Sequence, residues 1–389
     1  MHARTFLHKL LGSAIHKSRF KLLLTMIETL INVKSMTLTG LARGVMRPIQ
    51  ERSAIRMVDR FLGNHFFQKE NSIIFKAIIH FTIGNKAKPE IIIDWSKVPN
   101  EEEYILRAAL VATGRAITLY EEVHPKKKVG NALIQKKFLK QLRSLLPPNC
   151  IKPIIITDAG FKTPWFKEVQ KLEWDFVGRV RELNKIMYSK DGKTIEKCIK
   201  LTKSATATAK SLGKIALGKA NQFNVWCYVI KKKIKGRKKR FKNGKVDRRK
   251  SSAQYSRGER EGWVIVSSIA ATSSLIAKRV INIYSRRMTI EEGFRDLKSH
   301  QYGFGMDQNK TLKRERIIVW LLLAALASLL AWIVGYCAEK KGLQHQFQAN
   351  SIKYRRVLSL FYLGCQVIRK RIKMPVHFAN IIFFEEAQV

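Results

Sequence analysis

Four side chains that could bind phosphate or metal lie between residues 284 and 298: Tyr284, Arg287, Glu291 and Lys298. If this stretch forms one helix, turning by about 100° per residue, the four share a narrow stripe. An adjacent apolar stripe could seat the helix on a core; it consists of Ile283, Ile290, Phe294 and Leu297. The polar stripe has two interpretations: an ordinary solvated ion-pair surface, or a metal-binding carboxylate flanked by phosphate-holding groups.

Two further acids end short apolar runs that are typical of buried strands. Asp94 follows three isoleucines, and Asp158 follows three isoleucines and a threonine. Strand ends in α/β sheets gather at one edge, where sites form. An acid there costs desolvation energy unless it is paired or ligates a metal. Taken singly, each Asp could equally be a helix cap or a turn former.

Asp94, Asp158 and Glu291 together would make a cluster of three carboxylates. Such a cluster suits Mg²⁺, which proteins bind through a few carboxylates, with water and substrate phosphate. Two such ions can activate an attacking oxygen and stabilise a leaving one in phosphodiester chemistry. The combination favours the metal-binding interpretation over three unrelated structural acids.

The charge of the chain also points to phosphate. The 389 residues include 74 Lys and Arg against 29 Asp and Glu, so the formal net charge is +45. Such an excess destabilises a compact state by self-repulsion unless a polyanion screens it. Nucleic acid is the obvious polyanion; an anionic membrane surface, a ribosome-like structural role and a compositional bias are the alternatives.

Length and cysteine usage limit the class of protein. The chain is long enough for two or three domains and a sizeable core. Its five cysteines lie far apart and form no Cys-x-x-Cys pair. This pattern argues against a disulfide framework or a zinc site and fits a reducing cytoplasm. The first residues show no apolar core of a secretory signal.

One uncharged segment, Ile317–Ala338, is long enough to span a bilayer. It also suits a helix that is buried on all sides in a large protein. No second such segment occurs, and basic sequence continues on both sides. We favour the buried helix.

The first 80 residues or so read as helices, among them 20–31, 37–46 and 53–62, with Ser53 as a possible N-cap and Gly63-Asn64 as a stop. Two short helices around a turn resemble a helix-turn-helix DNA reader. The arginines available to it are Arg43, Arg47, Arg52, Arg56 and Arg60. A plain helical bundle with a charged surface is the alternative.

From residue 88 the pattern becomes mixed α/β. Strands are expected at 91–94, 103–113, 116–122, 153–158 and 176–181. Helices are expected at 132–146 and 164–172.

Between about 185 and 262 the apolar runs shorten, and only 223–230 and 262–267 read as strands. Residues 231–250 hold thirteen Lys and Arg against the single acid Asp247, a run that is usually solvated and whose best partner is phosphate. A loop at 301–309, the apolar helix and a helical basic tail at 351–373 complete the chain.

These residues resemble those of a known family, the cut-and-paste bacterial insertion-sequence transposases of the DDE class. The resemblance is to the IS-four family, whose mark is Tyr-x2-Arg-x3-Glu-x6-Lys. Tyr284, Arg287, Glu291 and Lys298 meet that spacing without a gap. The neighbouring Glu292 lies about 100° further round a helix, so the spacing favours Glu291. The likeness extends over nearly the whole chain.

The resemblance implies an α/β fold: an RNase H-like catalytic core, with a mixed sheet flanked by helices, interrupted by a β-rich insertion. A helical DNA-binding domain would occupy residues 1–85. The core would occupy 86–184 and 271–335, the second part carrying the catalytic helix and the buried apolar helix. The basic β-rich insertion would occupy 185–270, and a helical region, a possible dimerisation element, would occupy 336–389.

The resemblance also implies roles for individual residues. The three carboxylates would hold two Mg²⁺ ions, for which Mn²⁺ could substitute. Tyr284, Arg287 and Lys298 would grip phosphates near the cleaved end. Trp263 would stack on a flipped base, because an aromatic platform can offset the few kcal/mol that unstacking costs; a Trp that begins a strand is more often part of a core. Further DNA contacts would come from Arg179 and Arg181.

The expected activity is metal-dependent hydrolysis at the ends of a mobile element, formation and resolution of hairpin ends, and strand transfer into target DNA. The implied partners are double-stranded terminal inverted repeats, target DNA and a second copy of the chain, in the bacterial cytoplasm with the nucleoid and without stable membrane association. An RNase H-like nuclease without strand transfer, or a non-catalytic DNA-binding relative, is the alternative.

Overall fold

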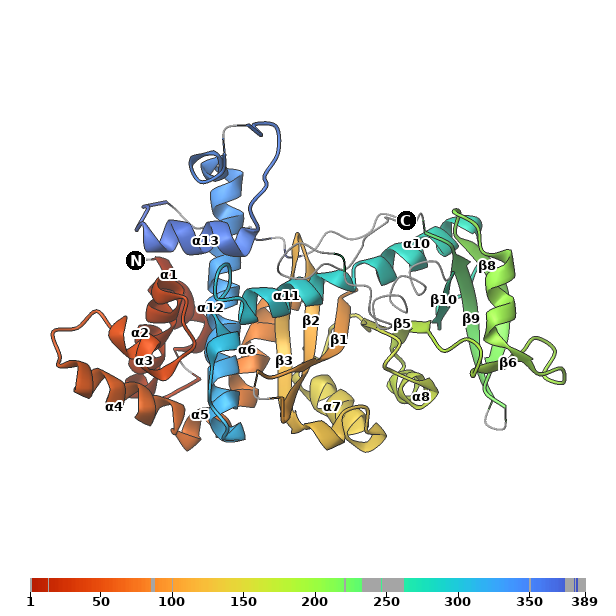
Figure 1. The fold of residues 1–389 in the computed structure, drawn as a ribbon, viewed down its shortest axis with the longest axis horizontal. Coiled ribbons are helices and arrows are strands. Elements are labelled where there is room, and N and C mark those ends of the chain that lie inside the picture. Colours follow the sequence, from red (N-terminus) through yellow and green to blue (C-terminus); the bar gives the residue numbers. More distant parts are fainter. Residues whose placement is uncertain are drawn as a thin grey trace. The chain divides into compact units, whose positions relative to one another are not determined.

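A computed structural model gives the fold of the chain (Figure 1). It describes residues 2–12, 14–84, 88–99, 101–219, 222–232, 246, 262–349, 351–374, 381 and 383. Most of the predicted basic run at 231–250 lies outside these residues. The chain forms two compact units: unit 1 is Met1–Ile151 with Met288–Val389, and unit 2 is Lys152–Arg287.

Unit 1 begins with a group of helices whose apolar faces are buried against one another. They are α1 (His2–Leu11), α2 (Lys17–Val33), α3 (Leu38–Arg43), α4 (Glu51–Leu62), α5 (His65–Lys69) and α6 (Asn71–Ile83). The predicted helices at 20–31 and 53–62 are therefore confirmed, whereas the helix predicted at 37–46 is shorter than expected, because α3 ends at Arg43. Ser53 as an N-cap is wrong, because α4 starts two residues earlier, after Gln50, while Gly63 ends it as expected.

Three antiparallel strands follow in unit 1, in the spatial order β3-β2-β1. They are β1 (Glu90–Lys97), β2 (Glu103–Ala112) and β3 (Arg115–Pro125). The register pairs Asp94 with Arg107 across β1 and β2, and Arg107 with Glu121 across β2 and β3. Because directly opposed residues point to the same face of a sheet, these three side chains share one face.

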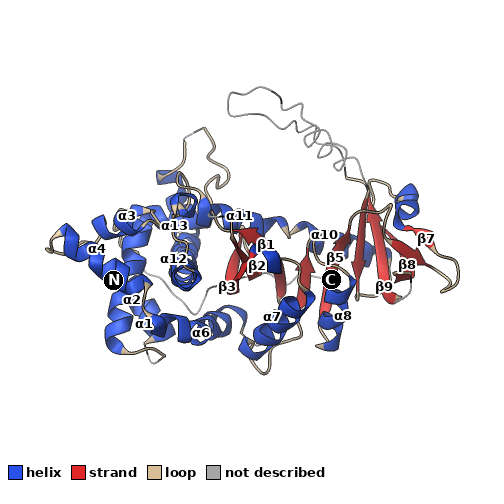
Figure 2. Ribbon diagram, turned by 60° about the horizontal axis from the view of Figure 1, so that its bottom comes forward, coloured by secondary structure: helices blue, strands red, loops and turns tan. Residues whose placement is uncertain are grey.

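Helices cover both faces of these three strands (Figure 2). On one face α11 (Met288–Lys298) contacts all three strands. On the other, Phe138 of α7 (Ala132–Leu145) lies with its ring centroid 5.2 Å from that of Tyr120. Since Tyr120 and Glu121 are neighbours in β3, their side chains point to opposite faces. The face that carries Asp94 is therefore the face that α11 covers.

The apolar helix α12 (Arg314–Lys340) lies in the core of unit 1, where it is crossed by α13 (Leu360–Arg369) (Figure 1). It is the one helix, among the described residues, that is long and apolar enough to cross a membrane, and 89% of its most apolar 18-residue window is buried. This burial supports the buried-helix interpretation. The predicted helical tail at 351–373 is shorter than expected, because only α13 is helical there.

Unit 2 holds a mixed sheet in the order β4-β5-β10-β9-β8-β6-β7. Its strands are β4 (Ile154–Thr157), β5 (Asp175–Val180), β6 (Met187–Ser189), β7 (Glu196–Lys197), β8 (Lys210–Leu217), β9 (Phe223–Ile230) and β10 (Trp263–Ser267). β4 and β5 are parallel, and the later pairs are antiparallel. Among the described residues of unit 2, the α-helices are α8 (Thr163–Lys171) and α10 (Ser274–Ser285). The predicted mixed α/β class and the predicted strands are confirmed.

The crossing of α12 and α13 brings backbone against backbone, and glycine allows this. A Cβ atom added at Gly364 would overlap the carbonyl oxygen of Ala331, and one added at Gly335 would overlap that of Leu360. We therefore expect Gly364→Ala to push the helices apart and to lower the free energy of unfolding by about 1–3 kcal/mol. Chemical denaturation of the purified protein measures this change.

Gly63→Ala is the matched control, because a Cβ there would meet only an ordinary contact, at 3.5 Å from the carbonyl oxygen of Asp59. Equal stability of the two variants would contradict the close helix crossing.

Candidate active site

Asp94 lies within β1 rather than at its end. The strand continues for three more residues, to Lys97, because Lys97 still pairs with Tyr104 of β2. The prediction that Asp94 closes its strand is therefore wrong. Its side chain is half-buried, and Oδ1 accepts a hydrogen bond of 2.8 Å from the backbone N–H of Trp95.

A buried ion pair lies beside Asp94 on the same face of the sheet. Arg107 and Glu121 are each 4% exposed, and their closest N–O distance is 2.7 Å. The Arg107 guanidinium also lies over the ring of Phe294 in α11, with Cζ 4.4 Å from the ring centroid. This contact fixes part of α11 directly above the strand residues next to Asp94.

Glu291 lies in the first turn of α11 and is exposed. An acid in this position is favoured by the partial positive charge of the helix N-terminus. The competing acid, Glu292, forms an ion pair of 2.9 Å with Arg295 one turn later. Its carboxylate is therefore engaged on the surface of α11.

Lys298 ties the end of α11 to β1. Its Nζ donates hydrogen bonds to Ser96 Oγ at 2.7 Å and to the backbone carbonyl of Lys97 at 2.6 Å. Burial lowers the pKa of Lys298 to about 8; repulsion from Arg107 and Lys97 adds to this, and Asp94 opposes it. Ser96 and Asp94, two residues apart, point to the same face of β1.

In unit 2, Asp158 directly follows β4, as predicted. It is half-buried, and its Oδ1 accepts a hydrogen bond of 2.8 Å from the backbone N–H of Gly160. This bond to the second residue along the chain makes a tight turn of the Asx type. Asp158 is thus a turn former, and the turn sets its carboxyl group at the end of a buried strand.

Tyr284 of α10 and Trp263 of β10 form an aromatic pair in unit 2. Their ring centroids are 5.2 Å apart at an angle of 82°. Two cations lie against the indole: Arg179 Cζ at 5.2 Å and Lys232 Nζ at 4.2 Å from its centroid. Lys232 also donates a hydrogen bond of 2.7 Å to Ser285 Oγ.

The charge around Tyr284 is mostly positive. Burial raises the pKa of its phenol, and the nearby Asp158 raises it further, whereas Arg287, Arg179 and Arg181 lower it. Unit 2 therefore gathers most of the groups predicted to contact DNA around one buried phenol.

The stretch from Tyr284 to Lys298 is not one helix. α10 ends at Ser285 and α11 begins at Met288. Tyr284 is buried in unit 2, whereas Phe294 is buried in unit 1. The apolar residues on the two sides of the break thus serve different cores. The predicted single stripe is wrong, although its four residues keep their spacing in the sequence.

The predicted site residues divide between the units. Asp94, Glu291 and Lys298 lie in unit 1, on β1 and α11. Unit 2 holds the remainder, namely Asp158, Tyr284, Arg287, Arg179, Arg181 and Trp263. Within the described part of the chain, no group of three or more His, Cys, Asp or Glu side chains is arranged to hold a metal ion.

Sequence reasoning missed three residues that shape these surroundings: Arg107, Ser96 and Lys232. Arg107 left a signal, since it is the one charged residue between Ile105 and Ala112 in a strand that otherwise reads as buried. Ser96 and Lys232 left none, because their roles arise from contacts across the fold.

Comparison with known proteins places this arrangement in a wider context. A family model described as a transposase DDE domain matches residues 86–330, more than half of the chain. No similar sequence was found among curated proteins. Among solved structures, the chain is similar to the cryo-EM structure of a piggyBac transposase synaptic complex with hairpin DNA, with a TM-score of 0.43 and 12% sequence identity. The likeness covers 99% of this chain and 82% of the other.

The buried pair of Arg107 and Glu121 predicts a large loss of stability when it is broken. Glu121→Gln would leave the guanidinium charge buried without its partner, so we expect the free energy of unfolding to fall by about 3 kcal/mol. In the exposed pair of Arg43 and Glu51, the same change, Glu51→Gln, should cost less than about 1 kcal/mol. Urea denaturation compares the two, and losses of equal size would refute the assignment.

The lowered pKa of Lys298 is open to direct measurement. Its amine should become reactive toward acetic anhydride with a midpoint near pH 8. A hydrogen bond and ion pair with Glu101 raise the pKa of the neighbouring Lys97, whose midpoint should therefore lie well above that of Lys298. Peptide mass spectrometry over a range of pH gives both values.

The lowered pKa of Lys298 also makes the stability of the folded protein depend on pH. Because the folded-state pKa of Lys298 lies below the ordinary 10.5, the charged amine disfavours folding below about pH 8. That penalty is relieved as the pH rises from about 8 toward 10.5. Identical labelling midpoints for the two lysines would rule out the buried environment.

Proposed function

The chain belongs to the transposase DDE-domain family, and on that premise we propose that it is a cut-and-paste DNA transposase of the IS-four type. It binds the terminal inverted repeats of an insertion sequence, hydrolyses DNA phosphodiester bonds, forms and resolves hairpin ends, and joins the freed ends to target DNA. The catalytic core has an RNase H-like fold. The protein acts as a homodimer on DNA, in the bacterial cytoplasm with the nucleoid.

One observation carries the proposal: Lys298 ties α11, the helix that bears Glu291, to β1, the strand that bears Asp94. Lys298 reaches Ser96, two residues from Asp94, at 2.7 Å. A carboxylate on the strand and a second on the covering helix can share a metal ion, and a lysine beside them can hold a phosphate. Asp158 is the proposed third carboxylate.

The carboxylates fit divalent metal, with Mg²⁺ as the working ion and Mn²⁺ as a substitute. They are hard oxygen donors, and Mg²⁺ uses one or two of them together with water and substrate phosphates. Bound as a pair, the ions would supply an activated attacking oxygen and a stabilised leaving oxygen. The chain's part is to hold Asp94, Asp158 and Glu291 with their carboxyl groups accessible.

The cations and aromatic rings of unit 2 would hold the DNA end. Tyr284, Arg287 and Lys298 would bind phosphates near the cleaved bond. Trp263, whose indole already has Lys232 and Arg179 against it, is suited to stack on a flipped base beside the phosphates that these cations bind. Arg181, which is exposed, adds charge to the same surface.

The test uses a supercoiled plasmid that carries this reading frame with its flanking genomic DNA, so that the natural element ends are present. With Mg²⁺, the wild-type protein should nick the ends, leave hairpins visible on denaturing gels, and form joined products. Glu291→Ala should lower the cleavage rate at least about a hundredfold, because a metal ligand contributes several kcal/mol to the transition state.

Glu292→Ala is the matched control, because that carboxylate is paired with Arg295 and should leave cleavage near the wild-type rate. Identical products from wild type and Glu291→Ala would refute the catalytic assignment. Nicks without joined products would indicate a nuclease, and DNA binding without cleavage would indicate a non-catalytic relative.

A further inference from the structure

Each of the three strands in unit 1 holds α11 through a polar or charged group. β1 accepts the hydrogen bonds of Lys298. β2 places Arg107 over the ring of Phe294. β3 contributes Arg115, whose Nε donates a hydrogen bond of 2.7 Å to Oδ2 of Asp296. The third contact joins residues 181 positions apart in the chain.

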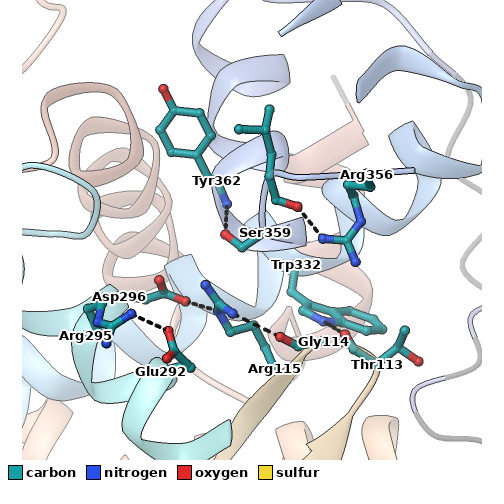
Figure 3. A network of polar contacts seen from close by, with 11 residues as sticks. Thr113, Gly114, Arg115, Glu292, Arg295, Asp296, Trp332, Arg356, Ser359 and Tyr362 are labelled. Atoms are coloured by element: carbon teal, nitrogen blue, oxygen red, sulfur yellow. Dashed lines mark hydrogen bonds and ion pairs between the residues drawn. The ribbon is translucent and has the colours of Figure 1, made fainter. Parts of the chain in front are cut away.

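Figure 3 shows the contact between Arg115 and Asp296. The pair is largely removed from solvent. The two side chains are 19% and 11% exposed. Arg115 is itself fixed by a second hydrogen bond, of 3.1 Å, to the carbonyl oxygen of Gly114 in the β2–β3 turn. Asp296 thus connects α11 to the tip of the β2–β3 hairpin, the hairpin that also carries Arg107, the residue opposite Asp94.

The backbone of Asp296 is fixed as well. Its carbonyl oxygen accepts a hydrogen bond of 2.8 Å from the N–H of Phe304, in the loop that follows α11. A Cβ added at Gly303 would overlap that carbonyl oxygen, so the loop passes directly against the helix end. Asp296 is therefore held by its side chain on the strand side and by its backbone on the loop side.

Apolar packing between α11 and the hairpin is incomplete at this point. A cavity of about 30 Å³ lies there, and Arg115, Asp296, Gly293 and Thr118 are among its lining residues. Gly293 presents no side chain to the hairpin. Close packing normally fixes how a helix is turned about its axis, and next to this cavity the ion pair adds a fixed contact.

Resting on the proposed function, we propose that Arg115 and Asp296 are a positioning pair that fixes the rotation of α11 and so aims Glu291 and Lys298. Asp296 lies between these two residues on the same helix, five positions after one and two before the other. A turn of the helix about its axis displaces both functional groups together. The proposed role of the pair is to position α11 and not to bind DNA or metal itself.

The experiment compares Asp296→Asn with Glu70→Gln. Glu70 also forms a part-buried ion pair with an arginine, Arg19, but that pair joins α2 to the start of α6 and does not involve α11. Both substitutions are isosteric and both should lower Tm. Three quantities are measured in each folded variant: the Kd for end-containing DNA, the cleavage rate at saturating DNA with Mg²⁺, and the pH midpoint of Lys298 acetylation.

Asp296→Asn should leave the Kd within about threefold and lower the cleavage rate about a hundredfold, because a misplacement of about 1 Å costs that much. The acetylation midpoint of Lys298 should rise from about 8 toward 10.5 as the amine leaves its buried place. Glu70→Gln should change neither the cleavage rate nor the midpoint. If Asp296→Asn does not fold, Arg115→Lys, which keeps the charge, takes its place with a defect of about tenfold.

A folded Asp296→Asn protein with a wild-type midpoint and a wild-type cleavage rate would overturn the positioning role. So would a loss of the same size in Glu70→Gln, which would reduce the effect to general destabilisation. The acetylation midpoint needs no DNA cleavage. If the wild-type protein fails to cut DNA, the proposed function fails, while the midpoint still decides whether the pair positions α11.

Discussion

A buried guanidinium is the constraint on which the candidate site depends. Arg107 lies in the middle strand of unit 1, opposite Asp94, and its charge is tolerated because Glu121 forms an ion pair with it at 2.7 Å. The same guanidinium supports the ring of Phe294 and so seats α11. It also helps to lower the pKa of Lys298. One residue thereby links the electrostatics of the site to the placement of its helix.

The break between α10 and α11 divides one stretch of sequence between the two units. Tyr284 and Arg287 belong to unit 2, and Glu291 and Lys298 to unit 1, although the four form one spaced mark in the sequence. A continuous helix would have to bury its whole apolar stripe against one core. Ending α10 at Ser285 lets each half bury its apolar residues in its own unit. The four residues therefore share a fixed spacing along the chain, but they do not lie on one face of a single helix.

The positively charged side chains and the apolar helix α12 occupy different parts of the fold. Cations lie around Tyr284 in unit 2 and around Lys298 in unit 1. The apolar residues of α12 are withdrawn from solvent, and the glycine crossing with α13 brings the two helices into backbone contact. The segment long enough to span a membrane is thus explained by a helix that is buried in the core. The strongly basic composition is consistent with membership of a transposase family.

The sequence by itself determined the mixed α/β class, the strands on which Asp94 and Asp158 depend, and the spacing that marks the family, because periodicity and residue type act locally. Only the tertiary structure decided where elements end and which groups meet. β1 runs past Asp94 because β2 offers partners as far as Lys97, and the long helix divides because its apolar residues face different cores. The contacts of Arg107 with Phe294 and of Arg115 with Asp296 join distant parts of the chain. No local pattern encodes such contacts, since they form only when strands and helix are already folded together.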